Sequence, residues 1–110
     1  MTQSDVEVGD QLAQLPVVAI SIPTSTADRS LSTRPGLLVG WSLRETTGSG
    51  AAVVEFEGSQ DTAGPHVGEQ ALAIGGTGSF QVAPDGAYCP AGLMLHVISG
   101  SVAGVAYYRH

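Results

Sequence analysis

Two pairs of short segments alternate apolar and polar residues, with a turn between the members of each pair. Apolar side chains recur at every second position in residues 36–44 and 52–57, and again in residues 93–98 and 102–109. That period is typical of a β-strand with one buried face. Turns rich in glycine and serine separate the members of each pair. The pattern therefore predicts two antiparallel hairpins.

Three further apolar runs predict strands at residues 17–22, 70–74 and 79–83. Proline stands on both sides of the first run, which suits a strand at the edge of a sheet. Residues 24–35 are rich in serine and threonine and are expected to form a loop, as is the segment around Pro90. No segment keeps apolar residues at helical spacing for three turns without a glycine or a proline.

These segments predict an all-β fold: an antiparallel β-sandwich of about seven strands, of the jelly-roll or immunoglobulin-like kind. The sandwich is expected to span residues 16–110. Residues 1–15 are polar and acidic without a clear period, so we expect an extended N-terminal arm there. A chain of 110 residues has room for a single domain.

The alternation also assigns a core face and an outward face to the paired segments. The residues expected in the core are Leu37, Val39, Trp41, Leu43, Val54, Phe56, Leu93, Leu95 and Val97. Because apolar residues outside a sheet can mark a contact surface, the outward apolar residues are candidate partner contacts. They are Leu38, Val53, Met94 and Ile98. The alternatives are scattered exposed residues, or a face that the second sheet covers.

Charge narrows the classes of partner. Four arginines stand against ten acidic residues, for a net charge of −6. Nucleic-acid binding is disfavoured, because phosphate neutralisation needs the opposite balance. Arg29 and Arg34 hold half of the positive charge within one predicted loop, either as candidate contacts to an acidic partner or as ordinary solvated residues. Charged residues make up only 13%, about half the usual share, so we expect neighbours to cover much of the surface.

The sequence contains glutamates and histidines, which can act in catalysis or bind metals, but they do not form a recognisable catalytic or metal-binding motif. Glu55 and Glu57 lie two apart on a predicted strand, a separation compatible with glycoside hydrolysis, but the alternation places both on the solvated face. His66, His96 and His110 do not show the spacing of a zinc site. We therefore expect a protein that is not an enzyme, with no catalytic residue, no cofactor and no metal.

The chain is expected to fold in a reducing cytoplasm. Cys89 is the single cysteine, so no internal disulfide can form, and we expect a small inert thiol there. The first residues lack the positive charge and apolar run of a signal peptide, and no apolar stretch is long enough to span a membrane. Lysine and asparagine are both absent, as is typical of a GC-rich genome.

The run from Leu38 to Ser49, with its strand tryptophan and hairpin turn, carries a family resemblance. Together with Gly92-Leu93 and the turn at residues 99–104, it resembles small β-sandwich structural proteins of tailed phages and prophages of actinobacteria. The resemblance covers about residues 36–109, and it transfers no catalytic residue.

This resemblance implies a component of the virion, for which two roles compete. One is a capsid decoration (minor capsid) protein that binds the outside of the major capsid shell, often as a trimer. The other is a tail or head–tail connector protein. The expected partners are the major capsid protein or other virion subunits, with further copies of the chain, and neither nucleic acid nor membrane. A carbohydrate-binding β-sandwich is the alternative from another class, and it would need an exposed aromatic platform.

Overall fold

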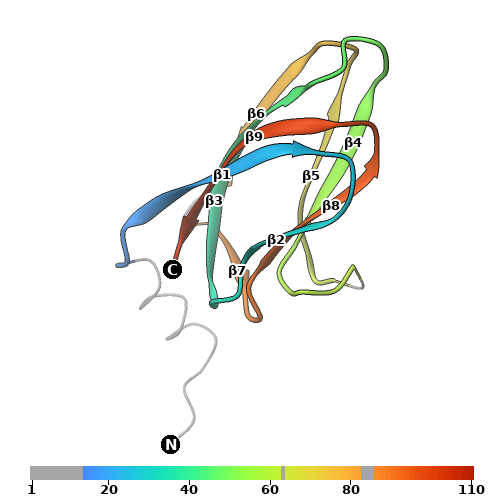
Figure 1. The fold of residues 1–110 in the computed structure, drawn as a ribbon. Coiled ribbons are helices and arrows are strands. Elements are labelled where there is room, and N and C mark those ends of the chain that lie inside the picture. Colours follow the sequence, from blue (N-terminus) through green and yellow to red (C-terminus); the bar gives the residue numbers. More distant parts are fainter. Residues whose placement is uncertain (1–13, 63, 83–85) are drawn as a thin grey trace, which may run out of the picture.

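The computed structural model describes residues 14–62, 64–82 and 86–110, which form two antiparallel sheets packed face to face (Figure 1). The predicted all-β sandwich is confirmed, with nine strands in the described part of the chain rather than about seven. They are β1 (Val17–Ser25), β2 (Arg29–Ser32), β3 (Gly36–Glu45), β4 (Ala52–Glu57), β5 (His66–Leu72), β6 (Thr77–Gln81), β7 (Ala87–Cys89), β8 (Leu93–Ser99) and β9 (Val102–Arg109). Of the arm expected at residues 1–15, all but the last two residues lie outside the described ones.

The two sheets differ in size and in where they take their strands from. The larger sheet has the order β1-β9-β3-β6, and β7 also pairs with β3. The smaller sheet has the order β2-β8-β4-β5. The first and last strands are therefore neighbours, and β9 lies between β1 and β3 (Figure 1). Both sheets are held together mainly by pairings between strands that are far apart in the sequence.

The two predicted hairpins are wrong. β3 belongs to the larger sheet and β4 to the smaller one, and the same division separates β9 from β8. The turns after β3 and β8 thus carry the chain across one end of the sandwich from one sheet to the other, and the Thr46 amide of the first turn donates a hydrogen bond to the Ser101 carbonyl beside the second. An apolar face that meets a facing sheet has the same period as one in a hairpin, so alternation does not distinguish the two connections. Among the described strands, only β4 and β5 are both consecutive and hydrogen-bonded to each other.

Two strands lie in segments that were expected to be loops. β2 has a single apolar residue among its four, and it pairs with β8 at the edge of the smaller sheet. β7 is three residues long and pairs with Gly36, Leu37 and Leu38. Both strands are too short to show a period of their own, and the backbone of a longer neighbouring strand positions them.

A β-bulge in β3 changes which residues enter the core. Consecutive β9 residues, Tyr107 and Tyr108, pair with Gly40 and Leu38, so Val39 is an extra residue. Because side chains alternate, one inserted residue moves the preceding positions to the opposite face. Leu38 is consequently fully buried in the core, and its prediction as an outward partner contact is wrong. Val39 is only half-buried.

The remaining predicted core residues largely share one layer between the sheets. Leu37 is buried but lies outside the main cluster, as the bulge requires. The other predicted residues belong to the cluster: Trp41, Leu43, Val54, Phe56, Leu93, Leu95 and Val97. Tyr108, which alternation did not select, is fully buried there too, and its hydroxyl donates a hydrogen bond to the carbonyl of Arg34 at 2.7 Å.

Trp41 connects the two sheets near the β5–β6 side of the sandwich. Its ring stacks on Phe56 of the smaller sheet at a centroid distance of 4.7 Å and on Phe80 of the larger sheet at 5.3 Å. The indole Nε1 donates a hydrogen bond to Gln70 Oε1 at 3.1 Å. Gly68 lies directly against the ring, where a Cβ atom would stand 2.5 Å from Trp41 Cη2. Only a residue without a side chain fits at this position.

Replacing Gly68 with alanine is expected to lower the free energy of unfolding by about 1–3 kcal/mol, the usual cost of overpacking a core. Gly50→Ala is the matched control, because a Cβ at Gly50 meets nothing within 4 Å. Urea unfolding followed by tryptophan fluorescence measures both variants. Equal stability of the two would contradict this account of the Trp41 contact.

Glu45 fastens two loops at one end of the sandwich. Its carboxylate accepts hydrogen bonds from the amides of Thr47 and Gly48 at 2.7 Å each, and from the amide of Gly75 at 2.9 Å. The Thr47 hydroxyl donates a further hydrogen bond. That hydroxyl, supported by the three amides, lowers the pKa of Glu45 to about 2. The ionised carboxylate therefore joins the β3–β4 loop to the β5–β6 loop.

Because the pKa of Glu45 is lower in the folded chain than its ordinary value of 4.5, this group stabilises the fold above about pH 4.5. The contribution is lost as the pH falls towards 2. We expect the free energy of unfolding of Glu45→Gln to fall less steeply than that of the wild type across this interval. Gly50→Ala, which removes no titratable group and adds a Cβ where nothing lies within 4 Å, should keep the wild-type slope. Denaturant titrations at several acidic pH values would reveal identical slopes if the hypothesis were wrong.

Candidate functional site

The outer face of the smaller sheet gathers carboxylates and imidazoles from three adjacent strands. Residues directly opposite each other on neighbouring strands point to the same side. Glu55 on β4 lies between Glu69 on β5 and His96 on β8. In the next outward row, Glu57 lies opposite His66. Positions that are scattered along the sequence therefore meet on one surface.

His66 contacts the carboxylates of both β4 glutamates. Its Nδ1 atom lies 2.6 Å from Glu57 Oε1 and 3.1 Å from Glu55 Oε2. One nitrogen and two oxygens, all within 4.8 Å of one another, thus form a compact set of donor atoms. The His66 side chain is 61% exposed, whereas that of Glu57 is fully buried. The cluster opens to solvent on its histidine side and is closed on its Glu57 side.

The β4–β5 connection brings these three residues together. Glu55 and Glu57 share a face because they are two apart on a strand. The chain then reverses, and the Gly58 amide donates a hydrogen bond to the Pro65 carbonyl at 2.7 Å. His66 thereby becomes the first residue of β5, opposite Glu57. Sequence reasoning placed His66 in a loop and missed the cluster; recognising that β4 and β5 form a hairpin would have found it.

Glu57 is fully buried, so its prediction as a solvated surface residue is wrong. Burial raises the pKa of Glu57, and a hydrogen bond with Glu55 raises it further, whereas His66 acts in the opposite direction. Glu57 Oε2 is the one buried side-chain polar atom in the described part of the chain that has no hydrogen-bond partner. A carboxylate oxygen in this state normally has a donor or a cation beside it.

The β4–β5 loop also explains why Met94 is not available to a partner. Met94 lies opposite Glu57 and Ser30, and it is only 7% exposed. Gln60, in the loop, accepts a hydrogen bond from the Ser30 hydroxyl and donates one to the Ser32 carbonyl. The loop thus lies over the edge of the smaller sheet, and the prediction of Met94 as a partner contact is wrong.

The other predicted contact residues differ from Leu38 and Met94 in that solvent reaches them. Ile98 is 48% exposed and Val53 is half-buried. Arg29 and Arg34 are exposed, and Arg29 Nε donates a hydrogen bond to Ser25 Oγ at 3.0 Å. Their proposed pairing with an acidic partner stays a prediction.

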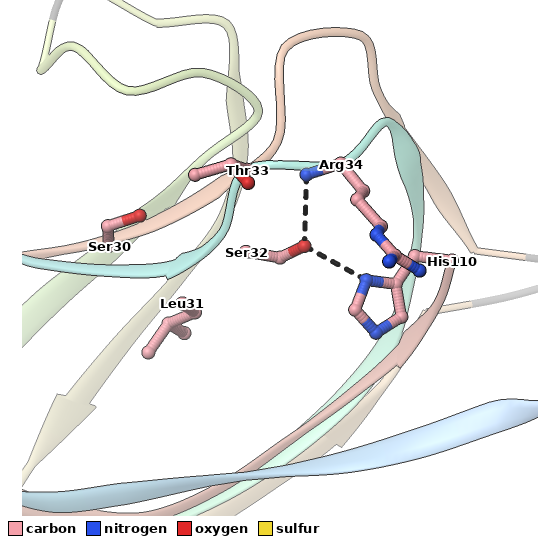
Figure 2. A pocket seen from close by; sticks show the side chains of 6 residues that line it. All are labelled: Ser30, Leu31, Ser32, Thr33, Arg34 and His110. Carbon is pink, nitrogen blue, oxygen red and sulfur yellow. Dashed lines mark hydrogen bonds between the residues drawn. The ribbon is translucent and has the colours of Figure 1, made fainter.

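Arg34 borders a hollow of about 370 Å³ between β2 and the end of β9 (Figure 2). The lining residues are Ser30, Leu31, Ser32, Thr33, Arg34 and His110. Ser32 Oγ lies 2.9 Å from His110 Nδ1 and accepts a hydrogen bond from the Arg34 amide at 3.2 Å, as Figure 2 shows. These hydrogen bonds fasten the β2–β3 turn to His110. We therefore interpret the side chains that line the hollow as structural ones.

A second histidine on the same sheet has a different partner. His96 Nδ1 lies 2.7 Å from Asp28 Oδ1, which also accepts a hydrogen bond from the Val97 amide at 3.1 Å. The hydrogen bond to Asp28 raises the pKa of His96. This pair fixes the segment before β2 against β8.

Cys89, in β7 beside β3, is fully buried in the core. Burial raises the pKa of its thiol to about 12, so the thiol stays protonated at neutral pH and is a poor nucleophile.

A scan against protein-family models found no match, and searches of curated proteins and of solved structures found none either. Within the described residues, no helix has the length and apolar character needed to cross a membrane.

Replacing Asp28 with asparagine is expected to lower the pKa of His96 towards its ordinary value of 6.5, because the hydrogen bond to a charged carboxylate is its main cause. NMR titration of the His96 ring in metal-free buffer measures the shift. Glu55→Gln should lower this pKa less, since Glu55 acts only through its charge. The pair should stabilise the fold at acidic pH and lose this effect as the pH rises through the pKa of folded His96. An unchanged pKa in Asp28→Asn would rule out the assigned cause.

Proposed function

We propose that this chain is a non-enzymatic structural subunit of a phage particle, and that it binds the outside of the major capsid shell as a decoration protein. The observation that carries the proposal is the contrast between the two outer faces of the sandwich. One face carries arginines and, among the described residues, no carboxylate, whereas the other face is acidic. The resemblance of residues 36–109 to small virion proteins supplies the class of assembly.

The outer face of the larger sheet is the one without carboxylates among the described residues. Its rows alternate with the core and include Ser21, Val105 and Ser42 side by side, followed by Ala19 and Tyr107. Tyr107 is 38% exposed. Among the described residues, the side chains on this face include no carboxylate. Arg44 and Arg109 stand in the flanking rows of the same face. A surface of small, apolar and aromatic side chains with two arginines can pack closely on a partner that presents acidic groups.

The outer face of the smaller sheet has the opposite character. Asp28, Glu55 and Glu69 lie on it with two histidines, over the buried Glu57. Such a face is readily solvated, and it repels other acidic surfaces. A subunit with these two faces has a natural orientation: the larger sheet towards the shell and the smaller sheet towards solvent.

The proposed partners are the major capsid protein or other virion subunits, together with further copies of this chain in a trimer. The open edge of the larger sheet supports contacts between copies, because β1 is paired on one side only and exposes Val17 and Val18. Trp41, the aromatic ring that a carbohydrate platform would most need at the surface, is 3% exposed. This burial weighs against the carbohydrate-binding alternative.

The experiment compares two variants that place a new carboxylate on opposite faces. Tyr107→Glu charges the face of the larger sheet, and Ala71→Glu charges an exposed position of β5. Each purified protein is added to particles that lack it, and bound copies are counted after sedimentation. We expect Tyr107→Glu to reduce occupancy at least tenfold and Ala71→Glu to leave it unchanged, with similar melting temperatures.

Gold-labelled antibodies on intact particles then locate the protein. Label spread over the head supports decoration of the capsid. Label confined to the neck or tail would contradict decoration and transfer the protein to the tail or connector role. Particles without label, after controls for epitope access, would contradict a virion function altogether.

A further inference from the structure

We propose that Glu55, Glu57 and His66 form a binding site for a divalent transition-metal ion of the Zn²⁺ type. The inference rests on the geometry of the smaller sheet and is independent of the virion function proposed above.

The donor atoms favour this class of ion. They are one imidazole nitrogen and two carboxylate oxygens, all within 4.8 Å of one another. Zn²⁺ and its transition-metal neighbours bind mixed nitrogen and oxygen sets of three protein ligands and leave a position for water. Ca²⁺ and Mg²⁺ prefer oxygen ligands alone and in greater number. A single imidazole beside two carboxylates thus selects the transition metals.

A second, independent observation favours a cation at this cluster. The Glu57 side chain is fully buried beneath its loop, and its Oε2 atom has no hydrogen-bond partner in the described residues. Its neighbour Glu55 is a second carboxylate, and within the described ranges the one basic side chain that contacts either of them is the ring of His66. Two adjacent carboxylates repel each other when both are ionised, and the burial of one of them adds a desolvation cost. A doubly charged ion compensates both.

The distances show where the ion would sit. His66 Nδ1 lies 2.6 Å from Glu57 Oε1 and 3.1 Å from Glu55 Oε2. Metal binding releases to solvent any proton held between these groups, and places the ion beside Nδ1 and the two carboxylates, within reach of the unpartnered Oε2 of Glu57. Ligand atoms around a tetrahedral zinc ion stand about 3.3 Å apart, given bonds of about 2.0–2.1 Å. The ring must therefore retreat by less than an ångström.

His66 is free to make that movement, because its side chain is 61% exposed and it is the first residue of β5. The carboxylates of β4 supply a fixed base, since Glu57 is buried and Glu55 is 23% exposed. The open side of the histidine leaves room for water as a fourth ligand. An ion bound here would fasten β4 to the start of β5 across their loop.

The test titrates the full, metal-free and tag-free chain with Zn²⁺ by isothermal calorimetry at neutral pH. We expect one ion per chain and a melting temperature that rises with Zn²⁺ concentration. His66→Ala and Glu57→Gln should each weaken the affinity at least tenfold. His96→Ala is the matched control, because His96 lies on the same face but binds Asp28, and it should retain the wild-type affinity.

A second readout remains informative if Glu57→Gln folds poorly. Long-range ¹H–¹⁵N NMR of the wild-type chain identifies which ring nitrogen binds the ion, and the proposal requires Nδ1 of His66, the nitrogen that faces both carboxylates. Coordination through Nε2, or through His96, would overturn the proposal. So would wild-type Zn²⁺ affinity in His66→Ala, or the absence of saturable binding at millimolar Zn²⁺.

Discussion

The stack of Trp41 between Phe56 and Phe80 is the contact on which the relation of the two sheets depends. It joins a central strand of each sheet to the β6 edge, and its one polar atom is satisfied by Gln70 from a fourth strand. A buried indole ring is large and rigid, so the residues that pack against it can change little in size without opening a cavity or causing a clash. The bare backbone of Gly68 is one result of that match. The contact links the inner layers of the two sheets, whose outer faces differ in charge: one carries arginines and the other carboxylates.

Alternation along the chain was sufficient to predict the fold class and most of the core. It failed where the physical cause lies outside the segment concerned. The apolar face of β3 looks the same whether the next strand is a hairpin partner or a member of the facing sheet, so the connections were misassigned. One extra residue, Val39, reversed the predicted faces of Leu37 and Leu38. A bulge of this kind depends on the pairing with β9 and leaves no local signal.

The acidic cluster shows the same limit for function. Glu55 and Glu57 were correctly placed on one face, but the environment of each depends on a loop that alternation does not describe. That loop buries Glu57 while Glu55 remains partly exposed, and it returns His66 to their side. The difference between a solvated surface and a site with a buried, unpartnered oxygen therefore arises from tertiary structure. Spacing alone did not contain it.

The position of β9 has a consequence for the order in which the chain can fold. This strand lies in the interior of the larger sheet, hydrogen-bonded to β1 on one side and to β3 on the other. While residues 102–109 are still inside the ribosome, β1 has no neighbour in its sheet and the core has no Tyr108. The larger sheet, to which the turns after β3 and β8 connect the smaller one, is then still incomplete. The larger sheet can therefore be completed only after synthesis of the last strand.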